Sequence, residues 1–244
     1  MSALKLTCNS KTKFSKYQKN TFGLMYGLPE NGGTCPGATT GKGGCLDVRD
    51  GLKRPTCYMA KVTSIYKAVG TVLAENTVLV KDKTLEEIQE VCEATIQTFI
   101  QQSKGENLYF RLAYSGDFFS ENYTKAWIET IKKHPEVQFW VYTRSDKFAE
   151  LLLGLPNLSV YLSCDPANFK TMLEIFERNK DKHNNLGMAW LGLDAPDPAV
   201  HRWVKCPEIT NKVKNTDEAG ACSKCRLCVD NFKIRIKNIE FPYH

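Results

Sequence analysis

The chain has 244 residues, a formal net charge of +6 and a hydrophobic content of 42%. This length suits one large domain over residues 1–244, and the composition is that of an ordinary globular protein. No run of about 18 apolar residues occurs, which argues against a membrane-spanning helix and a membrane partner. The first residues lack an apolar core of signal-peptide length, so we expect a protein of the cytoplasm.

The first part of the chain predicts one short strand and two helices. The strand is expected within residues 20–29, and a loop rich in glycine follows it. Helical periodicity then extends over residues 58–80. Thr84, with Glu87 three residues later, predicts the capped start of the next helix.

Strands and helices alternate from residue 109 onward. We expect strands at residues 109–114, 137–142, 158–163 and 186–191, and helices at 122–133, 146–153 and 168–179. A further strand is expected at 200–204, and an edge strand at 232–239, where apolar and charged residues alternate. This pattern predicts an α/β fold with mainly parallel strands, and a partial (β/α) barrel fits better than a doubly wound sheet. In either arrangement functional residues gather at the C-terminal ends of the strands.

Ten cysteines are many for a reducing compartment, so metal or cluster ligation is the first interpretation. Four of them form a cysteine-rich loop over residues 206–228: Cys206, Cys222, Cys225 and Cys228. Three cysteines at every third position, with a distant fourth followed by proline, are typical of ligands to a 4Fe–4S cluster. Zinc also accepts four thiolates and is the alternative.

A second group of cysteines lies after the expected first strand: Cys35, Cys45 and Cys57. Their spacing is too wide for a zinc knuckle, but the glycines between them allow the backbone to wrap around an inorganic core. Cys57 precedes a helix, whose dipole favours a thiolate. The alternative is three unrelated buried thiols. The two groups could share one cluster or hold two.

Polar residues at the strand ends are candidates for binding a small-molecule substrate: Arg111, Ser115, Asp117 and Arg144. Asp117 and Arg144 could equally form a structural ion pair. Of the remaining cysteines, Cys92 and Cys164 are expected to be packed thiols, and Cys8 is isolated.

The N-terminal segment, residues 1–19, contains five lysines between Lys5 and Lys19 and no acidic residue. Such a segment can contact nucleic acid or another polyanion. It can also be a solvated terminus.

Several of these blocks, in this order, resemble the phage-encoded gene product 88 family: Thr34-Cys35-Pro36-Gly37-Ala38, Cys57-Tyr58, Phe110-Arg111, Ser115-Gly116-Asp117-Phe118, Tyr142-Thr143-Arg144-Ser145, Cys206-Pro207 and Cys222-x2-Cys225-x2-Cys228. The resemblance covers residues from about 20 to 230. It implies a viral origin, and hence the host cytoplasm. It also implies an iron–sulfur cluster on a fold similar to that of radical S-adenosylmethionine enzymes.

One departure from those radical enzymes is clear. They hold their cluster through three closely spaced cysteines and leave one iron open for S-adenosylmethionine. Here the three cysteines after the first strand are spread over 23 residues, and four more could fill the cluster's open position. This weakens the case for S-adenosylmethionine binding.

The sequence therefore predicts a phage-type 4Fe–4S protein with one or two clusters. Redox or radical chemistry would take place at the C-terminal ends of the strands, with a redox partner or a small molecule as the second reactant. Catalytic residues are not identified, and whether the protein is an enzyme stays open. The alternative is a zinc-stabilised nucleic-acid-binding protein without catalytic activity.

Overall fold

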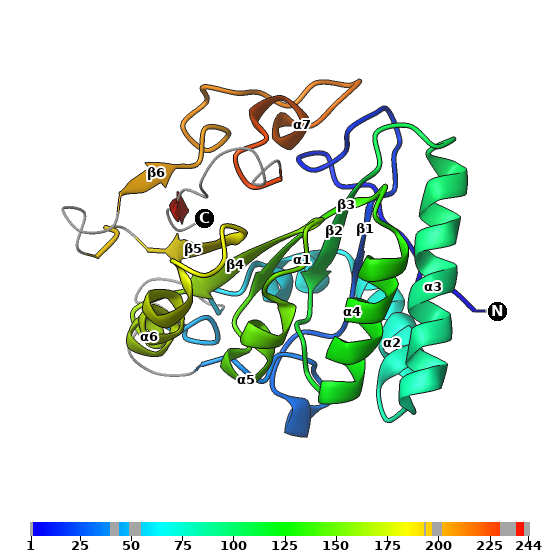
Figure 1. Ribbon diagram of the computed structural model, residues 1–244, viewed down its shortest axis with the longest axis horizontal. Helices are drawn as coiled ribbons and strands as arrows, with labels where there is room; N and C mark the ends of the chain where they lie inside the picture. The colour runs from blue at the N-terminus through cyan, green and yellow to red at the C-terminus, as the bar shows by residue number, and fades with distance from the viewer. Residues whose placement is uncertain are drawn as a thin grey trace.

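The computed structural model describes residues 2–39, 44–48, 55–192, 194–196, 202–229 and 238–241. Its centre is an open sheet of seven strands in the order β1-β2-β3-β4-β5-β7-β6, and every neighbouring pair is parallel (Figure 1). The strands are β1 (Thr21–Gly23), β2 (Tyr109–Ser115), β3 (Gln138–Thr143), β4 (Leu158–Cys164), β5 (Leu186–Leu191), β6 (Trp203–Lys205) and β7 (Asn238–Phe241). The predicted mixed α/β class with mainly parallel strands is confirmed.

The α-helices are α1 (Tyr58–Ile65), α2 (Lys67–Val80), α3 (Leu85–Gln102), α4 (Glu121–Lys133), α5 (Asp146–Ala149), α6 (Phe169–Asn179) and α7 (Ala221–Cys225). Two short 3-10 helices complete the set, η1 (Pro29–Asn31) and η2 (Glu150–Leu152). The predicted start of α3 is confirmed: Thr84 accepts from the Glu87 amide, and the Glu87 carboxylate accepts from the Thr84 amide. No helix of the described part of the chain is long and apolar enough to cross a membrane.

Four predicted elements differ from the structure, three in their extent and one in its position in the sheet. The helix expected over 58–80 is interrupted at Tyr66, whose φ of −112° and ψ of 88° are not helical. The β-branched residues of the sequence Val-Thr-Ser-Ile just before it weaken helix propensity there. The first strand is confined to β1, three residues long. Of the strand expected at 200–204, residues 203 and 204 belong to β6, while 200 and 201 lie outside the described residues.

The expected edge strand at 232–239 is wrong in its position in the sheet. β7 begins at Asn238 and lies between β5 and β6, pairing with both. Residues 232–237 lie outside the described part of the chain. Alternation of apolar and charged residues describes which side chains are buried, but it does not tell an edge strand from an inner one.

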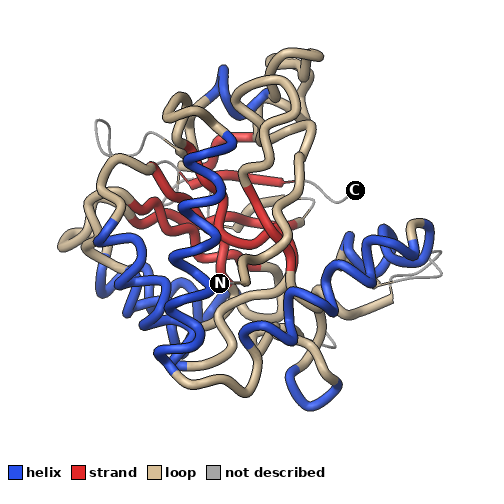
Figure 2. The backbone as a smooth tube through the Cα atoms, turned by 90° about the vertical axis from the view of Figure 1, so that its right-hand side faces the viewer, coloured by secondary structure: helices blue, strands red, loops and turns tan. Residues whose placement is uncertain are grey.

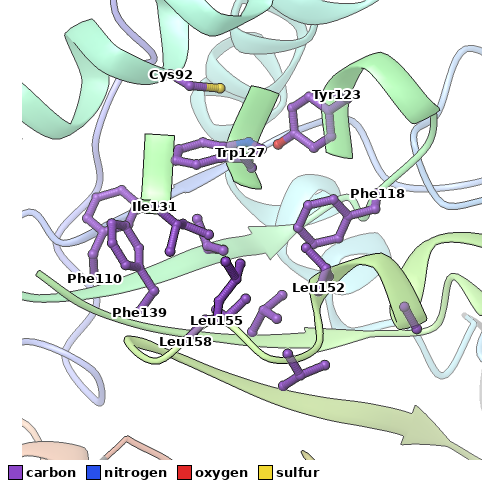
Figure 3. Packing of buried hydrophobic residues seen from close by; sticks show 14 of the residues in the cluster. Cys92, Phe110, Phe118, Tyr123, Trp127, Ile131, Phe139, Leu152, Leu155 and Leu158 are labelled. Atoms are coloured by element: carbon purple, nitrogen blue, oxygen red, sulfur yellow. The ribbon is translucent and has the colours of Figure 1, made fainter. Parts of the chain in front are cut away.

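One face of the sheet, the helix-covered face, packs against α3, α4, η2 and α6. Phe110 and Phe139 contribute from the strands, and Trp127 and Ile131 from α4 (Figure 3). Parallel strands bury both faces, so the other half of their side chains also needs a cover.

The opposite face, the loop-covered face, is packed against loops instead of helices. On β3, Trp140 packs with Phe14 of the N-terminal segment and with Val229. On β4, Tyr161 belongs to a cluster with Cys206. Turned by 90°, the chain above the strands is mainly loop (Figure 2). The cysteine-rich loop therefore lies on the sheet itself.

Candidate metal centre

The seven cysteines proposed as ligands divide into two sets. The first set is Cys35, Cys45 and Cys57; the second set is Cys206, Cys222, Cys225 and Cys228. The second set lines a single cavity, and none of the described first-set cysteines is on its wall. Within the first set, the Cys57 amide donates to the Cys45 carbonyl at 2.7 Å.

The first set lies near the C-terminal ends of β2 and β3. Burial raises the pKa of the Cys35 thiol far above its usual range, and nearby Asp117, Cys57 and Cys45 raise it further. Burial also raises the pKa of Cys57, while Arg144 opposes that shift. Uncharged thiols are therefore the stable form of Cys35 and Cys57 when no metal is bound.

Asp117 is held by protein groups on every side. Its carboxylate accepts from the Phe118 and Arg144 amides at 2.8 and 2.7 Å and from the Thr143 hydroxyl at 2.6 Å. Burial raises its pKa to about 6, against the effect of these hydrogen bonds. Ser115 is buried as well, and its hydroxyl donates to the Leu24 carbonyl at 2.8 Å. These contacts favour a structural role for both residues.

Arg144 joins the first cysteine loop to the sheet. Its guanidinium donates to the Gly37 carbonyl at 3.2 Å and to the Thr39 hydroxyl at 3.0 Å. The same side chain forms an ion pair with buried Asp165, at 2.8 Å but without hydrogen-bond alignment. Asp117 and Arg144 are thus in contact through the Arg144 backbone amide. The guanidinium of Arg144 forms its ion pair with Asp165 instead.

Gly37 explains why this loop can sit so close to β3. A Cβ at this position would lie 1.8 Å from the Arg144 carbonyl oxygen. Only glycine permits that approach of two backbones. Gly116, with a φ of +80°, turns the chain between Ser115 and Asp117.

The cysteines of the second set lie on the short helix α7, just after it, and just after β6. Cys206 follows β6 directly, and Cys222 and Cys225 lie on α7, one turn apart. The expectation of a non-helical loop is therefore wrong for these two residues. Arg226, with a φ of +56°, ends α7, and Cys228 follows in the turn beyond.

The cysteines of the second set line one cavity; Cys206 is buried and the other three are half-buried. Burial raises the pKa of Cys222 to about 11 and that of Cys228 to about 12. Lys11 and Arg111 act against the shift at Cys222 because a positive charge favours the thiolate. Deprotonation by a bound metal would be assisted by these two cations.

The cavity between these thiols is small. Its volume is about 30 Å³, which is room for about two water molecules. Among the described residues, no three His, Cys, Asp or Glu side chains are placed to hold a metal ion as they stand. The donor chemistry suits a thiolate-bound metal or cluster, but loading would require the cysteine side chains to turn.

The N-terminal segment is fastened to the second set. The Cys222 amide donates to the Lys11 carbonyl at 3.0 Å and the Gly220 amide to the Lys13 carbonyl at 2.8 Å. Lys11 pairs with Glu208 at 2.6 Å. In Figure 1 this dark blue segment lies beside α7. Residues 11–13 are thus part of the packed structure, not a free terminus.

The other predicted residues lie apart from both sets. Cys92 is in the core, and Cys8 is exposed. Cys164 is buried and donates to the Ala189 carbonyl at 3.5 Å. The packed thiols expected at Cys92 and Cys164 are confirmed.

Three residues near the two sets were missed by sequence reasoning. They are Lys11, Tyr142 and Asp165. Asp165 follows β4, so the rule of examining strand ends could have found it. Tyr142 shares the loop-covered face with Trp140, two positions earlier, which strand alternation could have indicated. Lys11 carried no local signal.

Fold and site together define a class: an open, parallel α/β protein with two largely half-buried cysteine sets near its sheet. The sequence profile described as "Gene product 88" matches residues 3–231. The chain therefore belongs to the gene product 88 family, as its motifs indicated, and the match begins earlier than the resemblance suggested.

Two relatives support this assignment. The "Gene 88 protein" of Mycobacterium phage L5 is 33% identical over 212 residues, which cover 84% of this chain and 82% of the relative. That of Mycobacterium phage D29 is 31% identical over 214 residues, covering 85% and 83%. The predicted bacteriophage origin is confirmed. No solved structure matches the chain significantly.

Proposed function

We propose that this chain is an iron–sulfur protein whose second set, Cys206, Cys222, Cys225 and Cys228, holds a 4Fe–4S cluster. The observation that carries the proposal is that four cysteines from two segments line one cavity. Four free cysteines, of which Cys206 is buried and the other three are half-buried, are the donor set that such a cluster uses. The cluster would supply one-electron redox chemistry.

The surroundings of the second set support a metal centre. Leu227, Val229 and Ile239 help to line the cavity, so its wall offers apolar surroundings to the sulfurs. Lys11, on the same wall, and Arg111, whose charge acts on Cys222, offset the negative charge of bound thiolates.

The first set, Cys35, Cys45 and Cys57, is not assigned as a ligand set of this cluster. It follows β1, where a radical enzyme of partial-barrel architecture carries its cluster, and this favours the likeness inferred from sequence. Radical chemistry with S-adenosylmethionine needs an iron that no protein thiolate occupies. Four thiolates in the second set leave no such iron, so we assign that centre an electron-transfer or structural role.

Anaerobic purification followed by iron, sulfide and zinc analysis tests the proposal. We expect iron and acid-labile sulfide in equal amounts, with the brown visible absorption of a cluster. The Cys225→Ala variant should lose this iron, while Cys45→Ala should keep it if the first set is not a ligand. Cys8→Ala is the matched control, because Cys8 is exposed and belongs to neither set.

Two results would overturn the proposal. A colourless protein that contains zinc would support the alternative of a zinc-stabilised protein. Iron retained in Cys225→Ala and lost in Cys45→Ala would move the centre to the first set. Nucleic-acid binding can be measured on the same samples; Lys5, Lys11 and Lys16 already pair with Glu75, Glu208 and Glu218.

A further inference from the structure

Tyr142 brings a hydroxyl group to the second set. It lies near the end of β3, on the loop-covered face, and lines the same cavity as the four cysteines. Burial raises the pKa of the Cys228 thiol, and the Tyr142 hydroxyl opposes that rise. Tyr142 therefore supplies a side-chain hydroxyl to the wall of the cavity that Cys228 also lines.

Arg111 brings a positive charge to the same place. Its guanidinium carbon lies 5.3 Å from the centre of the Tyr142 ring, an arrangement typical of a cation–π contact. The Arg111 Nε is buried and has no hydrogen-bond partner. Among the described residues, no acidic side chain lies within ion-pair distance of Arg111.

An unpaired cation on a packed sheet face is costly unless some anion compensates it. Its charge acts on the Cys222 thiol of the second set and also on the Tyr58 hydroxyl. Lys11 differs from Arg111, because it also forms an ion pair with Glu208 at 2.6 Å. Arg111 is thus a cation without an acidic partner among the described residues, and it stacks on Tyr142 of the cavity wall.

We propose, on the basis of the cluster proposed above, that Tyr142 and Arg111 raise the reduction potential of the second-set centre. A one-electron donor, such as a reduced flavin or ferredoxin-type protein, adds one electron to the centre, and no covalent bond forms or breaks. The added negative charge is stabilised by the hydroxyl donor at Cys228 and by the Arg111 guanidinium. Hydrogen bonds to ligand sulfurs and nearby charge are both known determinants of cluster potentials. Tyr142 and Arg111 are positioning residues in this proposal, not ligands.

A redox titration of the iron-loaded full chain, monitored by electron paramagnetic resonance, tests this role. Tyr142→Phe removes only the hydroxyl, and the reduced-to-oxidised ratio at a fixed potential should fall about threefold. Arg111→Gln should lower the ratio about tenfold, or about 59 mV for a one-electron couple. Arg111→Lys keeps the charge and should restore most of the wild-type potential.

Tyr161→Phe is the matched control. Tyr161 lies beside Tyr142 on the same face, with ring centres 5.3 Å apart, but its hydroxyl donates to the Leu227 carbonyl at 3.0 Å. Its loss should leave the midpoint potential unchanged. Wild-type potentials in both Tyr142→Phe and Arg111→Gln, at full iron content, would overturn the inference and leave the cluster proposal standing. If wild-type protein holds no iron, the cluster proposal itself fails and the inference with it.

Discussion

The two cysteine sets consist of the same residue type in different surroundings. The first set lies within a network of polar groups, where Asp117, Arg144 and Asp165 tie loops to strand ends. The second set lines a cavity with apolar walls, held between β6, α7 and the N-terminal segment. A network satisfied by its own partners can stay folded without a ligand. Buried thiols around a cavity gain most from a metal, so the second set should be the one that depends on it.

Metal removal should produce the largest effect. Treating the purified protein with a chelator should loosen residues 206–229 together with the N-terminal segment, because Lys11 and Lys13 are bonded to that loop. We expect trypsin to cleave after Lys11 and Lys13 about tenfold faster. Cleavage at Lys132, at the end of α4, is the internal control. Equal rates at the N-terminal sites before and after treatment would contradict the dependence.

Glycine substitutions can destabilise the surroundings of the first set and of the second set separately. A Cβ at Gly220 would lie 2.2 Å from the Lys11 carbonyl oxygen, and one at Gly37 would lie 1.8 Å from that of Arg144. We expect Gly220→Ala and Gly37→Ala each to lower the free energy of unfolding by about 2–4 kcal/mol. Only Gly220→Ala should also lose metal. Urea unfolding and metal analysis measure both effects.

Gly70→Ala is the control for that pair. Gly70 lies in α2 with open space around it, so alanine should raise the free energy of unfolding by about 0.5–1 kcal/mol. If Gly37→Ala lost metal and Gly220→Ala kept it, the first set and not the second would be the one that depends on metal.

Asp117→Asn tests whether the polar network supports the first set. In the variant an NH₂ group replaces one carboxylate oxygen. This NH₂ cannot accept a hydrogen bond from a backbone amide or hydroxyl donor, so one of the three buried hydrogen bonds of Asp117 is lost. We expect a loss of about 1–3 kcal/mol in thermal or urea unfolding, with the metal content unchanged. Asp146→Asn, at an exposed carboxylate, should change stability by less than about 0.5 kcal/mol. Similar effects of the two variants would argue against a structural role for Asp117.

Glu150 offers the smallest effect and a reference away from both sets. Hydrogen bonds from Arg178 and Asn179 lower its pKa from 4.5 to about 2. The carboxylate pair therefore stabilises the fold above about pH 4.5, and this contribution is lost as the pH falls toward 2. Because the pair is largely exposed, Glu150→Gln should cost less than about 1 kcal/mol at pH 7.

That cost should shrink at pH 3, because the carboxylate of the unfolded chain, with its ordinary pKa of 4.5, is protonated there. Urea unfolding of both proteins at the two pH values measures the difference. If the stability cost of Glu150→Gln grew as the pH fell, the predicted direction of the pKa shift of Glu150 would be wrong.

Much of the fold could be predicted because its signals are local. The strands in residues 109–191 are apolar runs, and the capping residues Thr84 and Glu87 predict the start of α3. The place of β7 between β5 and β6 could not be predicted, since strand order depends on contacts between distant segments. The break at Tyr66 shows the same limit within one helical pattern.

The site could be predicted in its residue types and less in its partners. Cysteine spacing identified both sets, and the strand-end rule found Asp117 and Arg144. It did not show that Arg144 pairs with Asp165, which depends on β3 and β4 being neighbours. Lys11, far from the cysteines in sequence, joins the second set through a backbone pairing that no local pattern encodes.

The sequence by itself determined the α/β class, the positions of most helices and strands, the family and the two groups of thiols. These follow from periodicity, capping and spacing, which act over a few residues. Only the tertiary structure decided that Cys206 and residues 222–228 line one cavity, that Arg111 and Tyr142 stand next to it, and that the N-terminal lysines are tied to its loop. The physical reason is that burial and charge depend on which faces meet, and those faces come from segments up to about 200 residues apart along the chain.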